Sequence, residues 1–404
     1  MKTRREQLLA IYTAGLDAVR GDNAVYQALL AQDEVCTATH VVAIGKAAEA
    51  MFQGAERYLG DAVRSALLIS KTGHFSAALR SGTRYRLIEA AHPVPDDSSL
   101  AAGRHLIAYL QQLPAGEPCL FLISGGASSL CEVLTGDWTL EALRSLTRFM
   151  LGAGYDIGSM NAVRQRLSQI KGGRLWQFVG ARPVRALLIS DVEGDHPSSI
   201  GSGLLFPPER DAVPPDLPAA WKQRLPAFAA LEPAPAFQWQ IVASNALALA
   251  AMQERARELG YPVRLEPRFL NGDTADEARQ CVSVLQQGVA GIHLWGGETT
   301  VRLPARPGRG GRNQHLALSA AVAMQGQENL LLLAAGTDGS DGLSADAGAL
   351  VDGASCARGR IVAGAAEGSL QRADSGTFLA ASGDLIHTGP TGTNVMDVVI
   401  GLKC

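Results

Sequence analysis

The chain has 404 residues, of which 47% are hydrophobic, so it can bury the cores of two or three domains. Its 36 basic and 39 acidic residues nearly cancel, and no basic block carries interleaved aromatic residues, which argues against nucleic-acid binding. No apolar run reaches the roughly 18 residues that a membrane span requires.

The cysteines and the N-terminus both indicate a cytoplasmic protein. An apolar run over residues 8–16 follows Arg4 and Arg5, but Glu6, Asp17 and the lack of a small-residue cleavage site favour an amphipathic helix over a signal peptide. Without any C-x-x-C pair, the cysteines predict reduced thiols rather than a disulfide frame or a zinc site. There are six of them: Cys36, Cys119, Cys131, Cys281, Cys356 and Cys404.

A buried strand is predicted over residues 40–45, and Lys46 stands in the turn between this strand and a helix that runs to about Tyr58. A lysine in such a turn can contact phosphate. The turn is not a Walker A loop, which requires G-x-x-x-x-G-K-[ST], because Ala47 follows the lysine. Lysines are few beside arginines in this chain, which favours a function for Lys46, although a lysine that caps exposed backbone gives the same pattern.

Two histidines lie in turns that follow predicted strands. His74 follows a strand predicted over residues 66–69, and His92 stands in the turn 91–96, whose prolines end a strand and whose aspartates begin a helix. A lone histidine in a turn is more often structural than a ligand, so we interpret both as structural.

A glycine- and serine-rich turn follows the buried strand predicted over residues 119–123. Such a turn can present backbone N–H and hydroxyl groups to an anion. It lacks the G-x-S-x-G spacing of a nucleophile elbow, so no hydrolase serine is predicted. The residues predicted to contact a nucleotide here are Ser124, Gly125, Gly126 and Ser128.

A helix is predicted over residues 160–174, with Arg164 and Lys171 on neighbouring turns of one side. Such a side is usually solvated. The strand predicted over residues 184–190 then ends in Asp191, which begins a cluster of acids. Carboxylates at the end of a central strand are typical of sites in open α/β folds.

The stretch 204–238 is rich in proline, which predicts a linker or an interdomain crossing. We therefore expect an N-terminal domain over residues 1–235 and a C-terminal domain over residues 236–404. Beyond the stretch, a strand, a polar turn and a helix to about Gly260 begin the second domain.

The densest group of candidate residues lies between Gly296 and Asp346. A strand predicted over residues 299–303 enters the loop 308–311, which begins a helix at about Arg312. Glycines let backbone N–H groups face a ligand, a helix N-terminus adds positive potential, and a guanidinium group supplies paired donors. The loop is therefore a predicted anion site, with nucleotide contacts from Gly310, Gly311 and Asn313.

A second buried strand, predicted over residues 330–335, ends at Asp338 and Asp341. A phosphate-binding loop beside hard oxygen ligands suggests a phosphoryl group and a magnesium ion. The turn is not an EF-hand, because Ser340 and Gly342 occupy positions that need an acid or an asparagine. Each piece alone is interpretable as a turn or a linker, but two such pieces within about forty residues favour a function.

Several long motifs carry a resemblance to the glycerate 2-kinases, whose C-terminal part is called the MOFRL domain. In chain order between Ile44 and Asp397 they read SGGASSL, MNAVRQRLSQIKGGRL, LLISDVEGD, GGETTV with GRGGRNQ, AAGTDGSDG and TGPTGTNVMD. The resemblance implies two α/β domains with a cleft between them, the first Rossmann-like. It also implies ATP- and magnesium-dependent phosphorylation of D-glycerate on its 2-hydroxyl, giving 2-phosphoglycerate.

The resemblance places the functional lysine and arginine of the family on Lys46 and Arg312, and its aspartates on Asp191 and Asp338. The chain departs from the usual pattern at His315, where the family has glutamate, at Leu204, where it has proline, and mildly in the SGGASSL motif. The first two departures bear on substrate fit or metal binding.

Phosphoryl transfer needs cations on the phosphates, a metal held by oxygens, and a carboxylate that orients or deprotonates the attacking hydroxyl. Lys46 and Arg312 are the predicted cations, and Asp191 is the predicted base. The remaining roles go to Asp338 or Asp341 for the metal, and to Arg164 and Lys171 for the glycerate carboxylate.

Two alternatives stay open. A hydroxypyruvate reductase would need G-x-G-x-x-G after a strand and an acid about twenty residues further on, and the sequence has no such fingerprint. A non-catalytic sugar-acid or nucleotide sensor is disfavoured by the retention of Lys46, Arg312 and the aspartates. We expect a cytoplasmic enzyme that binds D-glycerate and ATP, with no nucleic-acid or membrane partner, and a homodimer is one candidate assembly.

Overall fold

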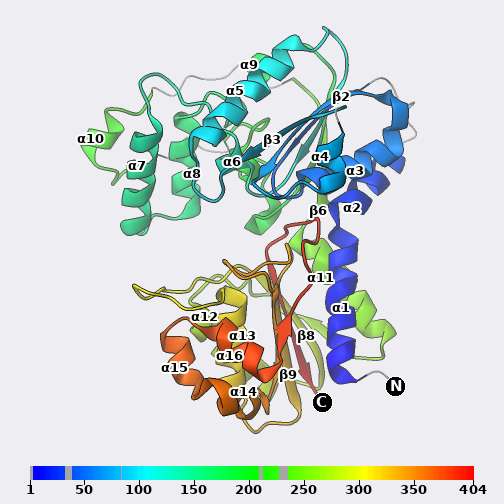
Figure 1. Cartoon of the computed structure of the whole chain (residues 1–404), viewed down its shortest axis with the longest axis vertical. Coiled ribbons are helices and arrows are strands. Elements are labelled where there is room, and N and C mark those ends of the chain that lie inside the picture. The colour runs from blue at the N-terminus through cyan, green and yellow to red at the C-terminus, as the bar shows by residue number, and fades with distance from the viewer. Residues whose placement is uncertain (1–2, 32–38, 83, 209–212, 227–234) are drawn as a thin grey trace. The chain divides into compact units, whose positions relative to one another are not determined.

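The computed structural model describes residues 3–31, 39–82, 84–208, 213–226 and 235–404. Cys36 and parts of the proline-rich stretch lie outside these residues. The chain forms two compact units, one of Gly21–Val242 and one of Met1–Arg20 with Ala243–Cys404 (Figure 1). Both combine a sheet with helices, which confirms two α/β domains. None of the described helices is long and apolar enough to cross a membrane.

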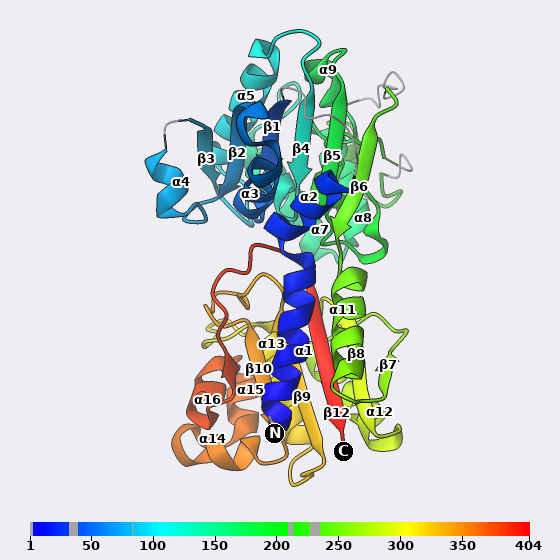
Figure 2. The same ribbon diagram turned by 90° about the vertical axis from the view of Figure 1, so that its right-hand side faces the viewer.

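The unit of Gly21–Val242 is built on a sheet with the described strand order β3-β2-β1-β4-β5-β6 (Figure 2). β1 to β5 are parallel to one another. This order is the Rossmann order, so the Rossmann-like prediction is confirmed. The strands are β1 (Thr39–Ile44), β2 (Val63–Lys71), β3 (Arg86–Ala90), β4 (Cys119–Ile123), β5 (Val184–Ile189) and β6 (Gln238–Ala243).

Strands β1 and β4 lie side by side, and the chain leaves them toward opposite edges of the sheet. Both are buried along their whole length, as continuous apolar runs in a parallel sheet are. Ligands of open α/β sheets bind at such a switch point, beyond the carboxyl ends of the strands. The turns after β1 and β4 are therefore the expected place for a site.

Helices surround this sheet, and a helical segment between β4 and β5 has a hydrophobic cluster of its own around Trp138, Leu146 and Val163. The helices are α2 (Gly21–Leu30), α3 (Ala48–Leu59), α4 (Ala77–Ser81), α5 (Asp97–Gln112), α6 (Ala127–Leu130), α7 (Leu140–Gly152), α8 (Ile157–Arg166), α9 (Trp176–Val179) and α10 (Ala219–Lys222). Short 3-10 turns are η1 (Gly60–Ala62), η2 (Glu193–Asp195) and η3 (Ile200–Ser202).

The helix predicted over residues 160–174 ends at Arg166 instead. The Ser168 side chain accepts hydrogen bonds from the backbone N–H groups of Ile170 and Lys171. A serine that bonds nearby backbone groups competes with the helix, so the chain turns here.

The second unit contains a mixed sheet with the described order β11-β10-β9-β12-β8-β7. Its central strand, β12, is antiparallel to both β8 and β9. Asp397, the first residue of β12, is paired in register with both Gly297 and Gly336, the last residues of those two strands. The strands are β7 (Val263–Leu265), β8 (Gly291–Gly297), β9 (Leu330–Gly336), β10 (Gly348–Asp352), β11 (Leu385–Ile386) and β12 (Asp397–Lys403).

Figure 2 shows the first helix lying beside α11 across one face of this sheet. Helices α12 to α16 lie on the other face (Figure 1). The helices are α1 (Arg4–Val19), α11 (Asn245–Glu258), α12 (Thr274–Gln287), α13 (Arg312–Ala323), α14 (Ser355–Ala363), α15 (Ala366–Gln371) and α16 (Ser375–Ser382).

Helix α1 belongs to the unit of the C-terminal residues, whereas the sequence assigned it to a domain of residues 1–235. Its apolar face is buried, and Arg5 makes ion pairs with Asp352 at 2.6 Å and with Asp384 at 2.7 Å. These partners follow Arg5 by more than 300 residues along the chain. An amphipathic pattern predicts that a helix buries one face but not which sheet covers it, so the sequence could not assign α1.

Candidate active site

Hydrogen bonds join the turns after β1 and β4. The backbone N–H of Lys46 donates to the carbonyl of Gly125 at 2.9 Å, and the N–H of Ala47 donates to the Ser124 hydroxyl at 3.1 Å. Lys46 itself is half-buried. The fold thus brings together two predicted candidates, the lysine and the glycine-rich turn.

Gly126 lies close to two side chains, His92 and Lys46, which leave little room for a side chain at this position. A Cβ added there would lie 3.0 Å from the His92 ring and 3.3 Å from Cγ of Lys46, and its φ of +85° also favours glycine. His92 therefore lies against the candidate site, although the sequence interpreted it as structural. Its place at the end of β3 was the available signal, since β3 shares its carboxyl edge with β1 and β4.

The segment that follows β5, from Asp191 to Ser202, also contributes residues near the glycine-rich turn. The hydroxyls of Ser128 and Ser202 are 2.8 Å apart, and Ser202 donates to the Asn161 side chain at 3.3 Å. Asp191 directly follows β5 and is half-buried. Ser202 and Asn161 were not predicted as site residues, although Asn161 lies in the motif MNAVRQRLSQIKGGRL that carries the resemblance.

Arg164 and Lys171 do not share one environment. Arg164 is half-buried, and among the described residues its guanidinium group makes no hydrogen bond or ion pair. Burial lowers the pKa of Arg164, and the nearby Glu132 carboxylate opposes this shift. A half-buried guanidinium group whose N–H donors have no hydrogen-bond acceptor among the described residues can bind an anionic ligand.

Lys171 is only 1% exposed and already has partners. Its ammonium group makes an ion pair with the buried Glu132 carboxylate and donates to the carbonyl of Ser128 at 2.7 Å. The contacts disfavour the prediction that Lys171 binds a substrate carboxylate, because Glu132 already balances its charge. Lys171 instead holds the backbone of the glycine-rich turn in place.

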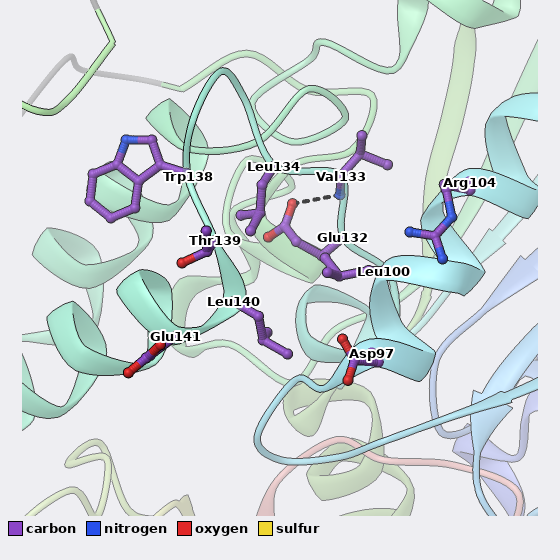
Figure 3. A pocket seen from close by; sticks show the side chains of 10 residues that line it. All are labelled: Asp97, Leu100, Arg104, Glu132, Val133, Leu134, Trp138, Thr139, Leu140 and Glu141. Atoms are coloured by element: carbon purple, nitrogen blue, oxygen red, sulfur yellow. Dashed lines mark hydrogen bonds between the residues drawn. The ribbon is translucent and has the colours of Figure 1, made fainter.

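A groove of about 560 Å³ lies beside this ion pair, between α5 and the beginning of α7 (Figure 3). It contains Asp97, Glu132 and Glu141 against Arg104, and Glu132 accepts a hydrogen bond from the Val133 N–H. None of the predicted site residues lines it. Its carboxylates disfavour an anionic substrate, so we do not assign it to the candidate site.

In the second unit, Arg312 is the centre of a charged cluster. It makes a two-pronged contact with Asp397, with Nε and Nη2 at 2.5 and 3.1 Å from the carboxylate oxygens, and its Nη1 is 2.7 Å from Glu298. Burial lowers the pKa of Arg312, but Asp397 and Glu298 outweigh it and the pKa is raised. Asp397 and Glu298 were not predicted as site residues.

The anion loop before Arg312 differs from its prediction. The strand predicted over residues 299–303 is absent, because β8 ends at Gly297, where its neighbour β12 begins. The loop is tied down instead, since the Arg309 N–H donates to Asp374 at 2.9 Å and its side chain pairs with Asp346 at 2.6 Å. Gly310 has a φ of +136°, a conformation that favours glycine.

Asp341 occupies the N-terminus of α13. One carboxylate oxygen accepts from the Asn313 N–H at 3.0 Å, and the other accepts from the Gln314 N–H at 2.7 Å. A Cβ on Gly311 would lie 2.3 Å from this carboxylate, so only glycine fits there. The backbone N–H of Asn313, predicted to bind a nucleotide, therefore already has an anion of the protein itself.

These contacts also disfavour Asp341 as a metal ligand. Its side chain is 2% exposed, and burial raises its pKa to about 7 against the opposing hydrogen bonds from Gln314 and Asn313. The structure therefore gives Asp341 the role of a helix cap, which Gly311 at the N-cap position cannot fill.

Asp338 is the remaining metal candidate. It is half-buried after β9, and its Oδ1 accepts from the Ser340 N–H and hydroxyl at 3.0 and 2.9 Å. No group of three acidic, histidine or cysteine side chains within the described residues could hold a metal ion alone. Magnesium commonly binds through one or two carboxylates together with substrate phosphates, so Asp338 fits a magnesium ion that arrives with a nucleotide.

The two main departures from the family pattern fill structural positions. His315 lies on α13 with Nδ1 3.3 Å from the Ser375 hydroxyl, and burial lowers its pKa. Leu204 is fully buried in the hydrophobic cluster around the first sheet. Neither side chain contacts a predicted site residue through a hydrogen bond or ion pair given by the described part of the chain.

Known families and proteins match nearly the whole chain. A domain of unknown function, DUF4147, matches residues 7–214, and the MOFRL family matches residues 291–397. The D-glycerate 2-kinase of Thermotoga maritima is 33% identical over 98% of this chain and 97% of its own. A putative hydroxypyruvate reductase of Agrobacterium vitis is 36% identical over 89% of this chain and 97% of its own.

A solved structure is similar in fold as well. The crystal structure of glycerate kinase from Thermotoga maritima superposes with a TM-score of 0.83 at 32% sequence identity, covering 98% of this chain and 99% of that chain. The similarity extends over both compact units.

The helix-cap role of Asp341 predicts a loss of stability rather than of metal binding. Asp341→Ala should lower the free energy of unfolding by about 1–2 kcal/mol, because two N–H groups of α13 lose their acceptor. Asp341→Asn should retain most of the stability, since asparagine also caps helices. Chemical denaturation measures both. Unchanged stability in Asp341→Ala, with a higher magnesium requirement, would return Asp341 to the metal site.

Proposed function

The chain belongs to the glycerate kinase family, and we propose that it transfers the γ-phosphoryl group of ATP to the 2-hydroxyl of D-glycerate in a magnesium-dependent reaction. It is a kinase, and glycerate phosphorylation is the activity named for its kinase relatives. The proposal rests on one observation: at the switch point, hydrogen bonds connect the turn that contains Lys46 to the glycine-rich turn at Ser124 and Gly125.

In the proposed reaction, the C2 oxygen of glycerate bonds to the γ-phosphorus while the bond from that phosphorus to the bridging β–γ oxygen breaks, so ADP leaves. The hydroxyl proton passes to a carboxylate, which we assign to Asp191 at the end of β5. Magnesium, when bound with the nucleotide, neutralises charge on the phosphate oxygens, and Asp338 would hold it.

The candidate cations are proposed to bind two different groups, the phosphates of ATP and the carboxylate of glycerate. Lys46 and the N–H groups of the glycine-rich turn are proposed to bind phosphate oxygens, and the planar group of Arg312 is proposed to do the same in the second unit. Arg164 is proposed to bind the carboxylate of glycerate, because its guanidinium group makes no hydrogen bond or ion pair among the described residues and only Glu132 lies near enough to affect its charge. Lys171 is proposed to hold the glycine-rich turn in place through its hydrogen bond to the carbonyl of Ser128.

The reductase alternative keeps one observation in its favour, the Rossmann strand order, together with the name of the Agrobacterium relative. The turn after β1 reads Gly45-Lys46-Ala47-Ala48, which lacks the glycines that let a backbone approach a pyrophosphate. We therefore expect no oxidation of NADH or NADPH with hydroxypyruvate.

We further propose that the enzyme works in the cytoplasm. The described cysteines are all free, and burial raises the pKa of the Cys119 and Cys131 thiols to about 12. Thiols of that kind are unreactive and suit a reducing compartment. The homodimer stays a prediction.

The identity of the product shows which hydroxyl of glycerate is phosphorylated. Purified protein with ATP, magnesium and D-glycerate should give 2-phosphoglycerate by phosphorus NMR, and enolase alone should convert this product to phosphoenolpyruvate. If phosphoglycerate mutase has to be added first, the product is the 3-phosphate and the proposed position is wrong. No phosphate ester from any glycerate enantiomer would contradict the function itself.

The two aspartates should respond differently to magnesium. Asp191→Asn keeps the shape but loses basicity, so kcat should fall roughly a hundredfold or more while the magnesium requirement stays nearly unchanged. Asp338→Asn should raise the magnesium concentration needed for half-maximal rate. Rates measured against magnesium for both variants test this division. The opposite pattern would exchange the two roles, and normal rates in both would place the site elsewhere.

Arg164 should set the affinity for the acceptor. Arg164→Gln should raise the KM for glycerate about 10- to 100-fold, the loss expected when one charge-assisted contact disappears, and leave the KM for ATP unchanged. Arg148→Gln, an exposed arginine on α7, is the matched control and should behave like the wild type. An equal change in both KM values would show that Arg164 serves the fold or the nucleotide rather than the acceptor.

A further inference from the structure

Tyr12 of α1 reaches the end of β9 from the first residues of the chain. Its side chain is 1% exposed, and its hydroxyl donates to the carbonyl of Gly336 at 2.7 Å. Gly336 is the last residue of β9, two positions before Asp338. A segment more than 300 positions away in sequence therefore contacts the strand end that carries the metal candidate.

The backbone between Gly336 and Asp338 is held from several sides. The Thr337 N–H and hydroxyl donate to the carbonyl of Met396 at 3.0 and 2.7 Å, and the Thr391 hydroxyl donates to the carbonyl of Thr337 at 2.6 Å. Tyr12 supplies the bond to the carbonyl of Gly336. The direction in which Asp338 leaves the strand depends on these bonds.

The hydroxyl of Tyr12 lies within electrostatic range of two carboxylates, Asp338 and Asp397. Burial, followed by the charges of Asp338 and Asp397, raises the pKa of Tyr12 far above its usual value. The phenol donates its only hydrogen to the carbonyl of Gly336. The effect of Tyr12 on Asp338 therefore acts through the backbone at Gly336.

We propose that Tyr12 is a positioning residue, which holds the Gly336–Asp338 backbone so that Asp338 can bind a magnesium–nucleotide, a role that rests on the proposed function. It follows that α1 contributes to the group of candidate residues around Asp338 in the C-terminal unit. The family model that covers residues 7–214 groups this helix with the other unit.

The test compares two tyrosines in the full-length protein. Tyr12→Phe removes only the hydroxyl. Tyr109→Phe removes a hydroxyl that is also buried and bonded, to Ser65 at 2.7 Å, but lies in the other unit and has no hydrogen bond to a site residue within the described part of the chain. Three quantities are measured for each: the Tm without ligand, the magnesium concentration that gives half of the Tm rise produced by ADP, and the magnesium concentration for half-maximal rate.

We expect Tyr12→Phe to raise both magnesium midpoints about three- to tenfold, as the loss of one hydrogen bond in the positioning of a ligand would. Tyr109→Phe should keep the wild-type midpoints even where its Tm falls. If Tyr12→Phe is too unstable to measure, Thr391→Val, which removes the bond to the Thr337 carbonyl, should shift the midpoints in the same direction.

Wild-type midpoints in both Tyr12→Phe and Thr391→Val would overturn the proposal, whatever happens to the Tm. A wild-type protein in which ADP gives no magnesium-dependent Tm rise would overturn it as well. If the wild type binds magnesium–ADP but does not phosphorylate glycerate, only the proposed function fails, and the Tm midpoints still decide the role of Tyr12.

Discussion

The site in the C-terminal unit depends on the ion pair between Arg312 and Asp397. Asp397 begins the central strand β12 and is paired in register with the ends of β8 and β9, while Arg312 begins α13. The pair therefore ties one helix N-terminus to three strand ends. Because Asp397 is only 6% exposed, removing Arg312 would leave the Asp397 charge buried without compensation, which is costly.

A similar constraint holds the candidate residues of the other unit together, through backbone groups, a hydroxyl and one buried ammonium group. Two N–H groups of the Lys46 turn donate to the glycine-rich turn, one to a carbonyl and one to a hydroxyl, and the Lys171 ammonium group donates to the carbonyl of Ser128. Groups that are ordered before a ligand arrives need not be ordered by it, so less binding energy is lost to conformational entropy. Donors fixed in advance are also the form in which charge stabilisation in phosphoryl transfer is effective.

The sequence predicted what depends on local pattern. Apolar runs placed β1, β4, β5 and β9 within a residue or so at each end, and the Rossmann-like order followed from the resemblance. It identified Lys46 and the glycine-rich turn separately, and the sheet brings the two together because parallel strands share a carboxyl edge. It did not predict which charges would be paired. Asp397 lies 85 positions from Arg312, and Glu132 lies 39 positions from Lys171, distances that no helical or strand period connects.

Asp341 shows how an anion-binding motif can be occupied by a side chain of the protein itself. A helix N-terminus that follows a glycine-rich loop attracts an anion, and the sequence analysis predicted that this anion is a nucleotide. The fold supplies it as the carboxylate of Asp341, which the chain brings to α13 from the turn after β9. The same attraction that would bind a phosphate is used here to fix the loop against the turn of Asp338. Positive potential at a helix end therefore marks where an anion binds, and only the tertiary contacts tell whether that anion is a ligand or part of the protein.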